Sequence, residues 1–499
     1  MSALQPSLSK SQYVKGLQCS KALWFYRNRK DLKPEIDSST QARFDTGNEI
    51  GILAQQFFKQ GIEVVTEYWD IKGAEKLTQQ YVKDGYEFIY EATAINPLDG
   101  AYSRIDILRK AEGTDAWDLI EVKSSTSVKA YHIDDVSLQY HAFSEAGYAI
   151  QNCYMMVIDN SYYRSGGIDT QKLFRLEKIT AKVLEKQSEV KSSIQELALI
   201  LGSKAEPEEE IGSRCNKPFE CGYKEHCWKD VPKYSIFNVF TGSKADKIVK
   251  EIGSYDIADL PEELYPRDNK KIDVASFAQG CEHVDRESLR SFLDQLKYPL
   301  YYLDYETIGP AIPLFDGTKA YDQIPFQFSL HVQREQGGQL AHFEYLHKKT
   351  EDPRRSVAGA LIDLCSNEGS IVVYNQSFEE SCNKKMAAAL PEYEEGLLQI
   401  NERMVDLLIP FRNRWLYHPS QESSASIKSV LPAFSGLGYD SMNIADGAEA
   451  SIQYQSFLEG KLSEAELEQL WVNLSKYCAL DTKAMAELID VLNNKCSED

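Results

Sequence analysis

Two patterns of hydrophobic and polar positions occur in the first 230 residues of the chain. In some segments apolar residues recur every three or four positions, which is the spacing of one helix face. In others, short runs of Ile, Val and aromatic residues indicate strands of a sheet interior. The helical pattern covers residues 11–28, 41–60, 134–147 and 172–202. The strand-like runs are residues 87–91, 103–108, 117–122 and 153–158.

The second half of the chain also has both helical and strand-like patterns, which follow a segment of interrupted helical spacing. Residues 232–297 have a helical spacing that glycine and proline interrupt, and we interpret them as a helical connector. Beyond them the pattern predicts strands at residues 301–306, 326–332 and 370–374 and helices at residues 377–390 and 462–492. Alternating strands and helices predict an α/β fold class. We therefore expect three parts, with bounds 1–231, 232–297 and 298–499.

Length and charge limit what the chain can bind. Its 499 residues predict about two to four domains. It carries 55 Lys and Arg against 76 Asp and Glu, a net charge of -21. No extended basic face is therefore expected, which argues against a protein that coats duplex DNA without regard to sequence. Contacts with nucleic acid must come from local positive clusters and bound cations.

The sequence predicts a cytoplasmic protein without a membrane partner. The amino terminus lacks the apolar segment of a signal peptide, and no run of about eighteen uncharged apolar residues occurs. In that compartment the 10 cysteines are expected to be thiols or metal ligands rather than disulfides. Six have no ligand-like spacing and are interpreted as ordinary thiols: Cys153, Cys281, Cys365, Cys382, Cys478 and Cys496.

Four other cysteines have an unusual distribution. Cys19 stands alone near the start, and Cys215, Cys221 and Cys227 follow far downstream. A lone early thiolate and a late trio do not form a local zinc knuckle. They require the chain to bring both ends of a domain together around a metal. By chemistry alone, a site of four thiolates suits either zinc or an iron–sulfur cluster.

Carboxylates and a lysine follow neighbouring strands of the first part. Asp106 and Glu121 lie on successive predicted strands, where their side chains could converge on one Mg²⁺ or Mn²⁺ ion. Lys123 points to the same strand face as Glu121 and could orient a water molecule or stabilise charge on a phosphate. Gln139, on the next helix, could contact the substrate or the attacking water. The alternative interpretation of Glu-x-Lys is an exposed ladder of charges.

Residues 8–230 resemble the PD-(D/E)XK nuclease superfamily. The resemblance is to its RecB-like branch, which includes CRISPR-associated exonucleases that carry an iron–sulfur cluster. It implies a restriction-endonuclease-like fold with Asp106, Glu121 and Lys123 in the active site. It also implies that the four cysteines Cys19, Cys215, Cys221 and Cys227 bind a [4Fe-4S] cluster, which would tie the two ends of the domain together.

Two positions differ from the common pattern of that branch. Its members often have a metal-binding histidine after a glycine on an early helix, whereas Gly47 is followed by Asn48 and Glu49 here. Either side chain could donate an oxygen instead. The cysteine trio is also more widely spaced than in most members, so zinc stays open as the structural alternative.

A second group of acids follows the predicted strands of the third part. Asp304 and Glu306 alternate on one strand and share a face. Tyr477 and Asp481 are four residues apart on a predicted helix and share its surface. Glu379 follows the strand at 370–374. These groups could hold two ions roughly 4 Å apart that clamp the attacking water and the leaving oxygen.

The order of these residues resembles the DnaQ-like 3′-to-5′ exonucleases of the DEDDy type, over residues 298–494. The resemblance implies a ribonuclease H-like fold. It also implies that Asp304, Glu306, Glu379 and Asp481 bind metal, with Tyr477 assisting the water. Glu379 stands where most of that family has aspartate. The whole arrangement is similar to uncharacterised bacterial proteins that fuse the two kinds of nuclease domain.

The spacing of four other polar residues near these motifs gives a weaker indication of a functional role. Asp406 is a rival fourth carboxylate, although a strand-end or helix-capping role is favoured. Lys428 could contact a phosphate, but a solvated lysine is the favoured interpretation. Gln327 and His331 alternate on one strand face, where structural roles are favoured.

The motifs together predict a metal-dependent nuclease with two centres. The expected substrate is single-stranded or frayed DNA, with RNA also open, and the expected C-terminal activity is 3′-to-5′ exonuclease. One alternative has a single active centre, the second, with the front domain gripping and threading the strand. The other is a non-catalytic nucleic-acid-binding adaptor. The presence of Lys123 and Tyr477 beside the expected acids argues against that last alternative.

Overall fold

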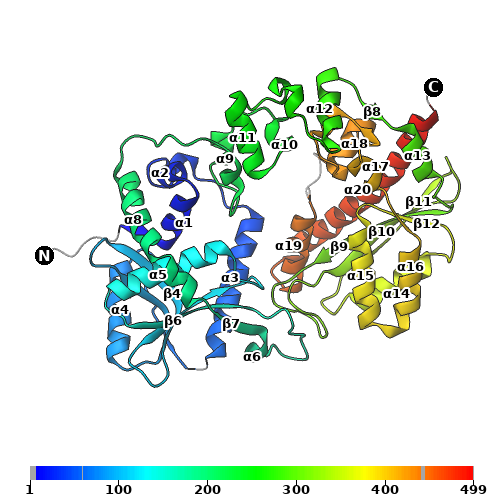
Figure 1. Cartoon of the computed structure of the whole chain (residues 1–499). Helices are drawn as coiled ribbons and strands as arrows, with labels where there is room; N and C mark the ends of the chain where they lie inside the picture. Colours follow the sequence, from blue (N-terminus) through cyan, green and yellow to red (C-terminus); the bar gives the residue numbers. More distant parts are fainter. Residues whose placement is uncertain (1–6, 59, 440–443, 445, 498–499) are drawn as a thin grey trace. The chain divides into compact units, whose positions relative to one another are not determined.

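The computed structural model describes residues 7–58, 60–439, 444 and 446–497. Its chain forms two compact units, drawn in Figure 1. The first consists of Met1–Asp230 with Pro310–Tyr321, and the second of Val231–Gly309 with Asp322–Asp499. Each combines helices with a mixed sheet, which confirms the predicted α/β class at this coarse level. Within the described ranges, no helix is long and apolar enough to cross a membrane.

The first unit is built on a seven-stranded sheet. The strands β3, β4 and β5 are antiparallel neighbours, and β6 runs parallel to β5. Strand β5 alternates its apolar side chains between two cores, with Leu119 in one and Ile120 in the other. The strands are β1 (Leu8–Ser9), β2 (Ile62–Glu63), β3 (Phe88–Ile95), β4 (Ala101–Lys110), β5 (Trp117–Lys123), β6 (Ile150–Ile158) and β7 (Phe174–Lys178).

Helices cover both faces of this sheet. Residues of α4, α5 and α7 share one hydrophobic core with it, and residues of α3 share the other. Helices α1, α2 and α8 pack together beside α5. The helices are α1 (Lys10–Gln18), α2 (Ser20–Asn28), α3 (Ser38–Phe57), α4 (Ile71–Lys83), α5 (Ala130–Glu145), α6 (Thr170–Leu173), α7 (Thr180–Glu185), α8 (Gln187–Gly202) and α9 (Lys224–Cys227).

The prediction of one long helix over residues 172–202 is wrong. The chain forms strand β7 at Phe174–Lys178 before the helices α7 and α8. The reason is local, because Phe-Arg-Leu-Glu-Lys alternates apolar and polar residues. Phe174 and Leu176 therefore face one core while the strand pairs with β6. The helical segment at residues 11–28 is likewise two helices, which meet at the extended residue Cys19.

The second unit has a five-stranded sheet in the order β11-β10-β9-β12-β13. Strand β10 runs antiparallel to both β11 and β9, while β9, β12 and β13 run parallel to one another. The strands are β9 (Leu300–Ile308), β10 (Ile324–Gln333), β11 (Leu340–Leu346), β12 (Ser370–Val373) and β13 (Met404–Asp406), and β8 (His283–Val284) pairs separately with β14 (Leu416–Tyr417).

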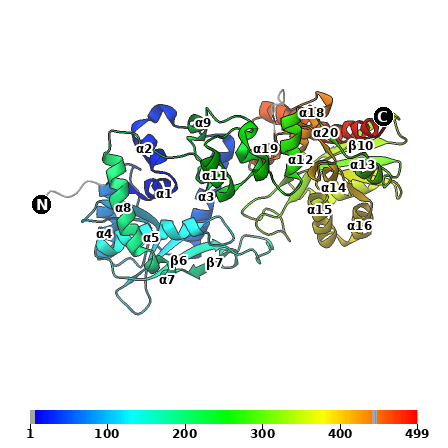
Figure 2. The same ribbon diagram turned by 45° about the horizontal axis from the view of Figure 1, so that its top comes forward.

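Helices also sandwich this second sheet, as Figures 1 and 2 show. Leu303 and Tyr305 of β9 pack against α14, α15 and α16, whereas α19 and α20 contact β9 from the other side. The helices of this part are α14 (Arg354–Leu364), α15 (Gln376–Ala389), α16 (Glu394–Glu402), α17 (Leu408–Arg412), α18 (Ile427–Ser435), α19 (Gly447–Leu458) and α20 (Glu464–Ser497).

The predicted connector folds as part of the second unit. Its helices are α10 (Ile236–Val239), α11 (Gly242–Ile252), α12 (Lys270–Gln279) and α13 (Arg286–Leu293). Gly253 ends α11 with φ of 71°, a left-handed conformation that glycine adopts without strain. Asp273 of α12 forms a buried bidentate pair with Arg414, with Oδ–N distances of 2.5 and 2.9 Å. This pair fixes α12 to the segment after α17.

Removal of Asp273 tests the importance of this pair for stability. We expect Asp273→Ala to lower the free energy of unfolding of the second unit by about 3–5 kcal/mol, because it leaves the guanidinium of Arg414 buried without its partner. Urea denaturation of the full chain measures the change. Glu251→Ala, at an exposed position of α11, is the control and should change it by less than about 0.5 kcal/mol. A loss no larger than the control's would contradict this account.

His331 of β10 makes the second unit sensitive to pH. Its Nδ1 lies 2.8 Å from the hydroxyl of Thr482 on α20. Burial, helped by His342 and Lys483, lowers its pKa from 6.5 to about 4. The neutral imidazole is thus favoured in the folded state. Its contribution to stability is full above pH 6.5 and is lost as the pH falls toward about 4.

We therefore expect His331→Gln, which cannot titrate, to flatten this dependence. Between pH 7 and pH 5 the variant should lose less unfolding free energy than the wild type does, as measured by urea denaturation at both values. Because the two proteins differ only at residue 331, the titration of other groups contributes equally to both unfolding free energies and cancels in the difference. If the unfolding free energy falls by the same amount between pH 7 and pH 5 in the two proteins, His331 does not cause the pH dependence.

Candidate functional site

The first unit brings four predicted site residues together. Asp106 of β4 accepts a hydrogen bond through Oδ2 from the backbone N of Val122 at 2.6 Å. Glu121 of β5 accepts one from Lys123 through Oε1 at 2.8 Å. Its Oε2 accepts from the side chain of Gln139 on α5 at 2.5 Å. Gln139 thus positions Glu121, and its own Oε1 has no hydrogen-bond partner among the described residues.

Two further charged residues complete this centre, and the sequence patterns did not reveal them. Lys10, the first residue of α1, places Nζ 2.6 Å from Oε1 of Glu121. Lys123 also contacts Asp135 of α5 at 2.8 Å. No spacing links residue 10 to residue 121. Asp135, in contrast, lies four residues before Gln139 on one helix face, and this spacing was a usable signal.

Burial and neighbouring charges shift the pKa values of Asp106 and Glu121 in opposite directions. Burial and the neighbouring charge of Glu121 raise the pKa of Asp106 to about 8. Burial would also raise the pKa of Glu121, but Lys10 and Lys123 outweigh it and hold that pKa well below its usual range. The pKa of Lys123 is raised, because the attraction of Glu121 outweighs the effect of burial. Glu121 is therefore ionised and already paired with ammonium groups.

A cavity of about 470 Å³ opens beside Asp106. Glu91 of β3 also lines it. Its position follows from the strand register, because Tyr90 pairs with Ile107 and Ala92 pairs with Ile105. Glu91 is thus a third carboxylate near Asp106, and burial raises its pKa. The predicted alternatives to histidine, Asn48 and Glu49, are exposed on α3 and are not part of the described lining.

The four cysteines with the unusual distribution lie around one cavity of the first unit. Cys19 lies between α1 and α2, Cys215 and Cys221 lie in the segment after α8, and Cys227 ends α9. All four line the same cavity. Phe25 and Tyr223 pack beside them. The fold therefore brings four thiols from distant parts of the sequence to the lining of one cavity, and thiolates are ligands that both iron and zinc accept.

The second unit gathers another set of predicted residues around a cavity of about 510 Å³. Asp304 and Glu306 reach it from β9, and Tyr477 and Asp481 reach it from α20. The alternation of side chains on β9 places both acids on the face opposite Tyr305, as predicted. Four of the five predicted residues of this centre therefore line one cavity.

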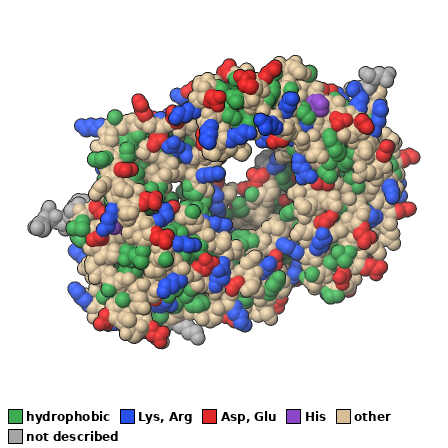
Figure 3. All heavy atoms as spheres, in the orientation of Figure 1, with side chains coloured by type: hydrophobic (Ala, Val, Ile, Leu, Met, Phe, Trp, Pro, Cys, Tyr) green, Lys and Arg blue, Asp and Glu red, His purple; other side chains and the backbone are tan. Residues whose placement is uncertain are grey.

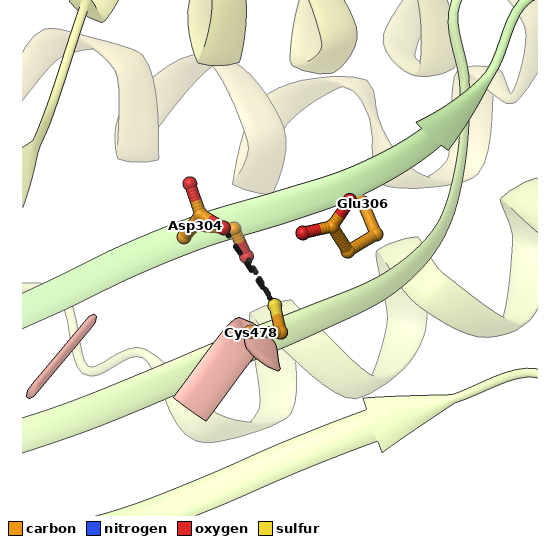
Figure 4. Close-up of side chains that lie close together, drawn as sticks. All are labelled: Asp304, Glu306 and Cys478. Atoms are coloured by element: carbon orange, nitrogen blue, oxygen red, sulfur yellow. Dashed lines mark hydrogen bonds between the residues drawn. The ribbon is translucent and has the colours of Figure 1, made fainter. Parts of the chain in front are cut away.

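Asp304 and Glu306 lie close to the side chain of Cys478, as Figure 4 shows. One ligand atom from each of Asp304, Glu306 and Cys478 lies within 4.8 Å of the others. The Cys478 thiol lies 3.7 Å from Oδ2 of Asp304. Cys478 was interpreted from the sequence as an ordinary thiol, although it directly follows Tyr477. Two carboxylates at this separation are suited to a shared divalent cation.

The acids of this cavity are buried without enough positive charge. Burial and the charge of Asp481 raise the pKa of Asp304 well above its usual range. The same two causes raise the pKa of Glu306 to about 8. Burial also raises the pKa of Asp481, although a hydrogen bond from Tyr439 at 2.5 Å limits the rise to about 6. The raised pKa values favour the protonated forms of Asp304 and Glu306 near neutral pH, whereas Asp481 is mostly ionised there.

Lys428 supplies positive charge to the cavity. It lines the wall, and its Nζ lies 5.4 Å from the ring centroid of Tyr477 and 5.6 Å from that of Tyr439. It also lowers the pKa of Glu306 and Asp481. Sequence reasoning favoured a solvated lysine, whereas Lys428 is half-buried and lines the cavity. No spacing in the sequence links residue 428 to the acids of this cavity.

Glu379 and Asp406 have different environments. Glu379 is 2% exposed, and its Oε2 has no hydrogen-bond partner among the described residues. It is not part of the described cavity lining, but it contributes to the raised pKa of Asp304. Asp406 accepts hydrogen bonds from the backbone N of Asn375 and of Leu408, each at 3.0 Å. Asp406 therefore has the strand-end and capping contacts that were favoured for it.

Three helices begin at this cavity. Phe378 lies in the first turn of α15, Ile427 opens α18 and Gly447 opens α19, and all three line the wall. Backbone N–H groups at a helix start carry partial positive charge and favour anions. A cavity with carboxylates at its base, a lysine on its wall and helix starts around it can hold a cation and a phosphate together.

A metal ion fits the second centre more readily than the first. In the second, Oε2 of Glu379 has no hydrogen-bond partner among the described residues. Burial and the charge of Asp481 raise the pKa of Asp304, so its carboxylate gains more from a nearby cation. In the first, hydrogen bonds from Lys10, Lys123 and Gln139 already occupy both oxygens of Glu121. A metal there must displace an ammonium group from Glu121.

The surface agrees with the expected absence of a broad basic face, on the side that Figure 3 shows. Acidic and basic side chains are interspersed over each unit there, without a large patch of one sign. Binding of a polyanion therefore depends on local groups such as those of the two cavities.

Comparison with known proteins places a family match on the second centre. A family model described as "Domain of unknown function (DUF2779)" matches residues 301–426. That span contains Asp304, Glu306 and Glu379 and ends just before Lys428. The matched region thus carries the first acids of the centre but not Tyr477 and Asp481.

Three bacterial proteins are similar to part of the chain. Uncharacterized protein MG366 of Mycoplasma genitalium is 27% identical over 215 residues, which cover 39% of this chain and 32% of that protein. The MG366 homolog of Mycoplasma pneumoniae is 28% identical, with the same coverage. Uncharacterized protein UU173 of Ureaplasma parvum is 26% identical over 213 residues, which cover 38% of this chain and 31% of that protein. The chain therefore matches about a third of the length of these curated relatives.

Proposed function

We propose that the protein is a divalent-metal-dependent nuclease that hydrolyses phosphodiester bonds of single-stranded or frayed nucleic acid, with DNA as the expected substrate. The observation that carries this proposal is the second cavity. There, the half-buried Asp304, the buried Glu306 and Asp481, and Tyr477 share a cavity with Lys428 and the starts of three helices. The C-terminal centre is proposed to remove nucleotides from 3′ ends in the cytoplasm.

The chemistry of the cavity suits phosphodiester hydrolysis. Asp304, Glu306 and Asp481, with Glu379 behind them, would hold Mg²⁺ or Mn²⁺, which polarises the phosphate and activates water. The hydroxyl of Tyr477 is proposed to hold the attacking water. Burial and the nearby acids raise its pKa above the usual range, so the phenol keeps its proton and can donate a hydrogen bond.

Positive groups on the wall of the second cavity suit the other reactant. The ammonium of Lys428 and the helix starts are proposed to bind the phosphate oxygens and to stabilise their charge as the bond breaks. The sheet order β11-β10-β9-β12-β13, with three antiparallel strands followed by parallel ones, supports the ribonuclease H-like fold that the motifs imply.

The first unit is proposed to be a PD-(D/E)XK domain. The convergence of Asp106, Glu121 and Lys123 on adjacent strands supports this assignment. Its four cysteines are proposed to bind a [4Fe-4S] cluster of structural role, since the ligands come from both ends of the unit. A zinc ion in the same four-thiolate site is the alternative.

One observation favours a variant of this function with a single active centre. Glu121 is paired with Lys10 and Lys123 at 2.6 and 2.8 Å, so its oxygens are less open to a metal than those of the second centre. In this second candidate function, the first unit binds and threads the strand and only the second centre cleaves it.

Replacement of one acid in each centre separates these possibilities. In the protein purified without air, with Mg²⁺ or Mn²⁺ and end-labelled single-stranded DNA or RNA, we expect Asp304→Asn to reduce 3′ trimming by about a hundredfold or more. The reason is the loss of a carboxylate that supports metal catalysis worth about 3 kcal/mol. Asp106→Asn should remove a distinct set of products. Asp363→Asn, at an exposed position of α14, is the control.

The product patterns decide between the candidate functions. If Asp304→Asn abolishes all cleavage and Asp106→Asn abolishes none, the single-centre variant holds. If the metal-replete wild type degrades neither DNA nor RNA of any end structure, the nuclease proposal is wrong.

The cluster proposal has its own test. We expect Cys19→Ser to lose the brown iron–sulfur absorbance and to lower the unfolding temperature of the first unit, because the bond between its two ends is lost. Iron, sulfide and zinc content, measured on anaerobic protein, give the readout. Cys281→Ser, at an exposed position, should change neither. Full iron content and colour in Cys19→Ser would contradict the ligand assignment, and stoichiometric zinc in the wild type would support the zinc alternative.

A further inference from the structure

Two exposed aromatic side chains stand beside the first centre. Tyr68 and Trp69 are each 78% exposed. Both line the cavity of about 470 Å³ that has Asp106 in its wall. Tyr102 of β4 lines the same cavity, and Tyr68 is close enough to contribute to its raised pKa after the larger effect of burial. Three aromatic rings therefore border the approach to Asp106.

The turn that carries the pair is fixed by the chain itself. The backbone N of Asp70 donates to the carbonyl of Glu67 at 2.9 Å and closes the turn. The side chain of Asp70 then accepts from the backbone N of Gly73 at 2.9 Å, which caps α4. The backbone on either side of Trp69 is thus fixed by hydrogen bonds of the turn and of the helix cap. Because tyrosine and tryptophan have only two side-chain torsions, they lose little entropy when a ligand packs against them.

The lining of the cavity contains two cations and two carboxylates, Glu91 and Asp106. Lys10 and Arg104 both line it. The Nη2 atom of Arg104 is buried and has no hydrogen-bond partner in the part of the chain that the structure describes. An arginine fork matches the geometry of phosphate oxygens. The cavity therefore combines exposed rings at its mouth, a guanidinium donor inside and a carboxylate of the centre beside it.

We propose that this cavity binds an unpaired nucleotide of a single-stranded nucleic acid, with its base stacked on Trp69 or Tyr68 and its phosphate on Arg104 and Lys10. This inference rests on the proposed nuclease function and names how the strand reaches Asp106. Stacking on an aromatic ring needs a base that is free of its neighbours, so the site selects single strands and frayed ends over duplex. Because the net charge is -21, affinity must come from such a local cluster.

Binding of labelled oligonucleotides tests this assignment. Fluorescence anisotropy is measured with single-stranded oligothymidylate and oligouridylate, without added divalent metal, so that cleavage does not interfere. We expect Trp69→Ala to weaken binding by about 5- to 150-fold, the range for one lost base stack. Trp69→Phe should keep most of the affinity, because phenylalanine also stacks. Leu98→Ala, which removes another side chain that is 73% exposed, should bind as the wild type does.

A duplex of the same length provides a second readout. The wild type should prefer the single strand, and Trp69→Ala should reduce this preference. A larger loss with oligothymidylate would identify DNA as the ligand, and a larger loss with oligouridylate would identify RNA. Equal affinities of the wild type and Trp69→Ala for both single strands would overturn the inference.

Failure of this inference can be distinguished from failure of the nuclease function. If Trp69→Ala weakens binding but the wild type cleaves nothing with Mg²⁺ or Mn²⁺, the binding site stands and the nuclease proposal falls. If the wild type cleaves and Trp69→Ala binds the oligonucleotides as tightly as the wild type, the nuclease proposal stands and the binding site falls. A wild type that binds neither oligonucleotide and cleaves neither would overturn both.

Discussion

Carboxylates that are buried close together repel one another, and each unit has to compensate for this repulsion. The first unit does so with lysines. Glu121 accepts hydrogen bonds from Lys10 and Lys123 and stays ionised at a lowered pKa, while Asp106 beside it has a raised one. The contact of Lys10 with Glu121 also links the start of α1, which is far from β5 in the sequence, to the sheet. It also means that a metal must compete with an ammonium group there.

The second unit leaves the same repulsion largely uncompensated. Asp304, Glu306 and Asp481 share a cavity in which Lys428 is the one lysine or arginine of the described lining. The raised pKa values of the acids express this deficit of positive charge. A cavity of this kind is proposed to bind a divalent cation, and the surrounding helix starts favour an anion nearby. The two centres therefore differ in how much positive charge surrounds their acids.

Strands and their acids could be predicted because their signals are local. Glu121 and Lys123 two residues apart, or Asp304 and Glu306, define a strand face without knowledge of the rest of the chain. Contacts from distant segments could not be predicted, which is why Lys10 and the inward turn of Lys428 were missed. Strand β7 was missed for a different reason, since its five alternating residues lie inside a longer helical pattern. The convergence of Cys19 with the late cysteines followed from chemistry, because lone thiolates need partners to hold a metal.

The account depends most directly on the claim that the acids of the second cavity bind divalent cations. Titration of the protein with Mn²⁺, followed by electron paramagnetic resonance of the free ion, measures this binding without any substrate. We predict that Glu306→Gln weakens the tight binding of Mn²⁺ strongly, whereas Glu121→Gln changes it little, because Glu121 is already paired with lysines. Tight Mn²⁺ binding that survives Glu306→Gln unchanged, or that is absent from the wild type, would contradict the account.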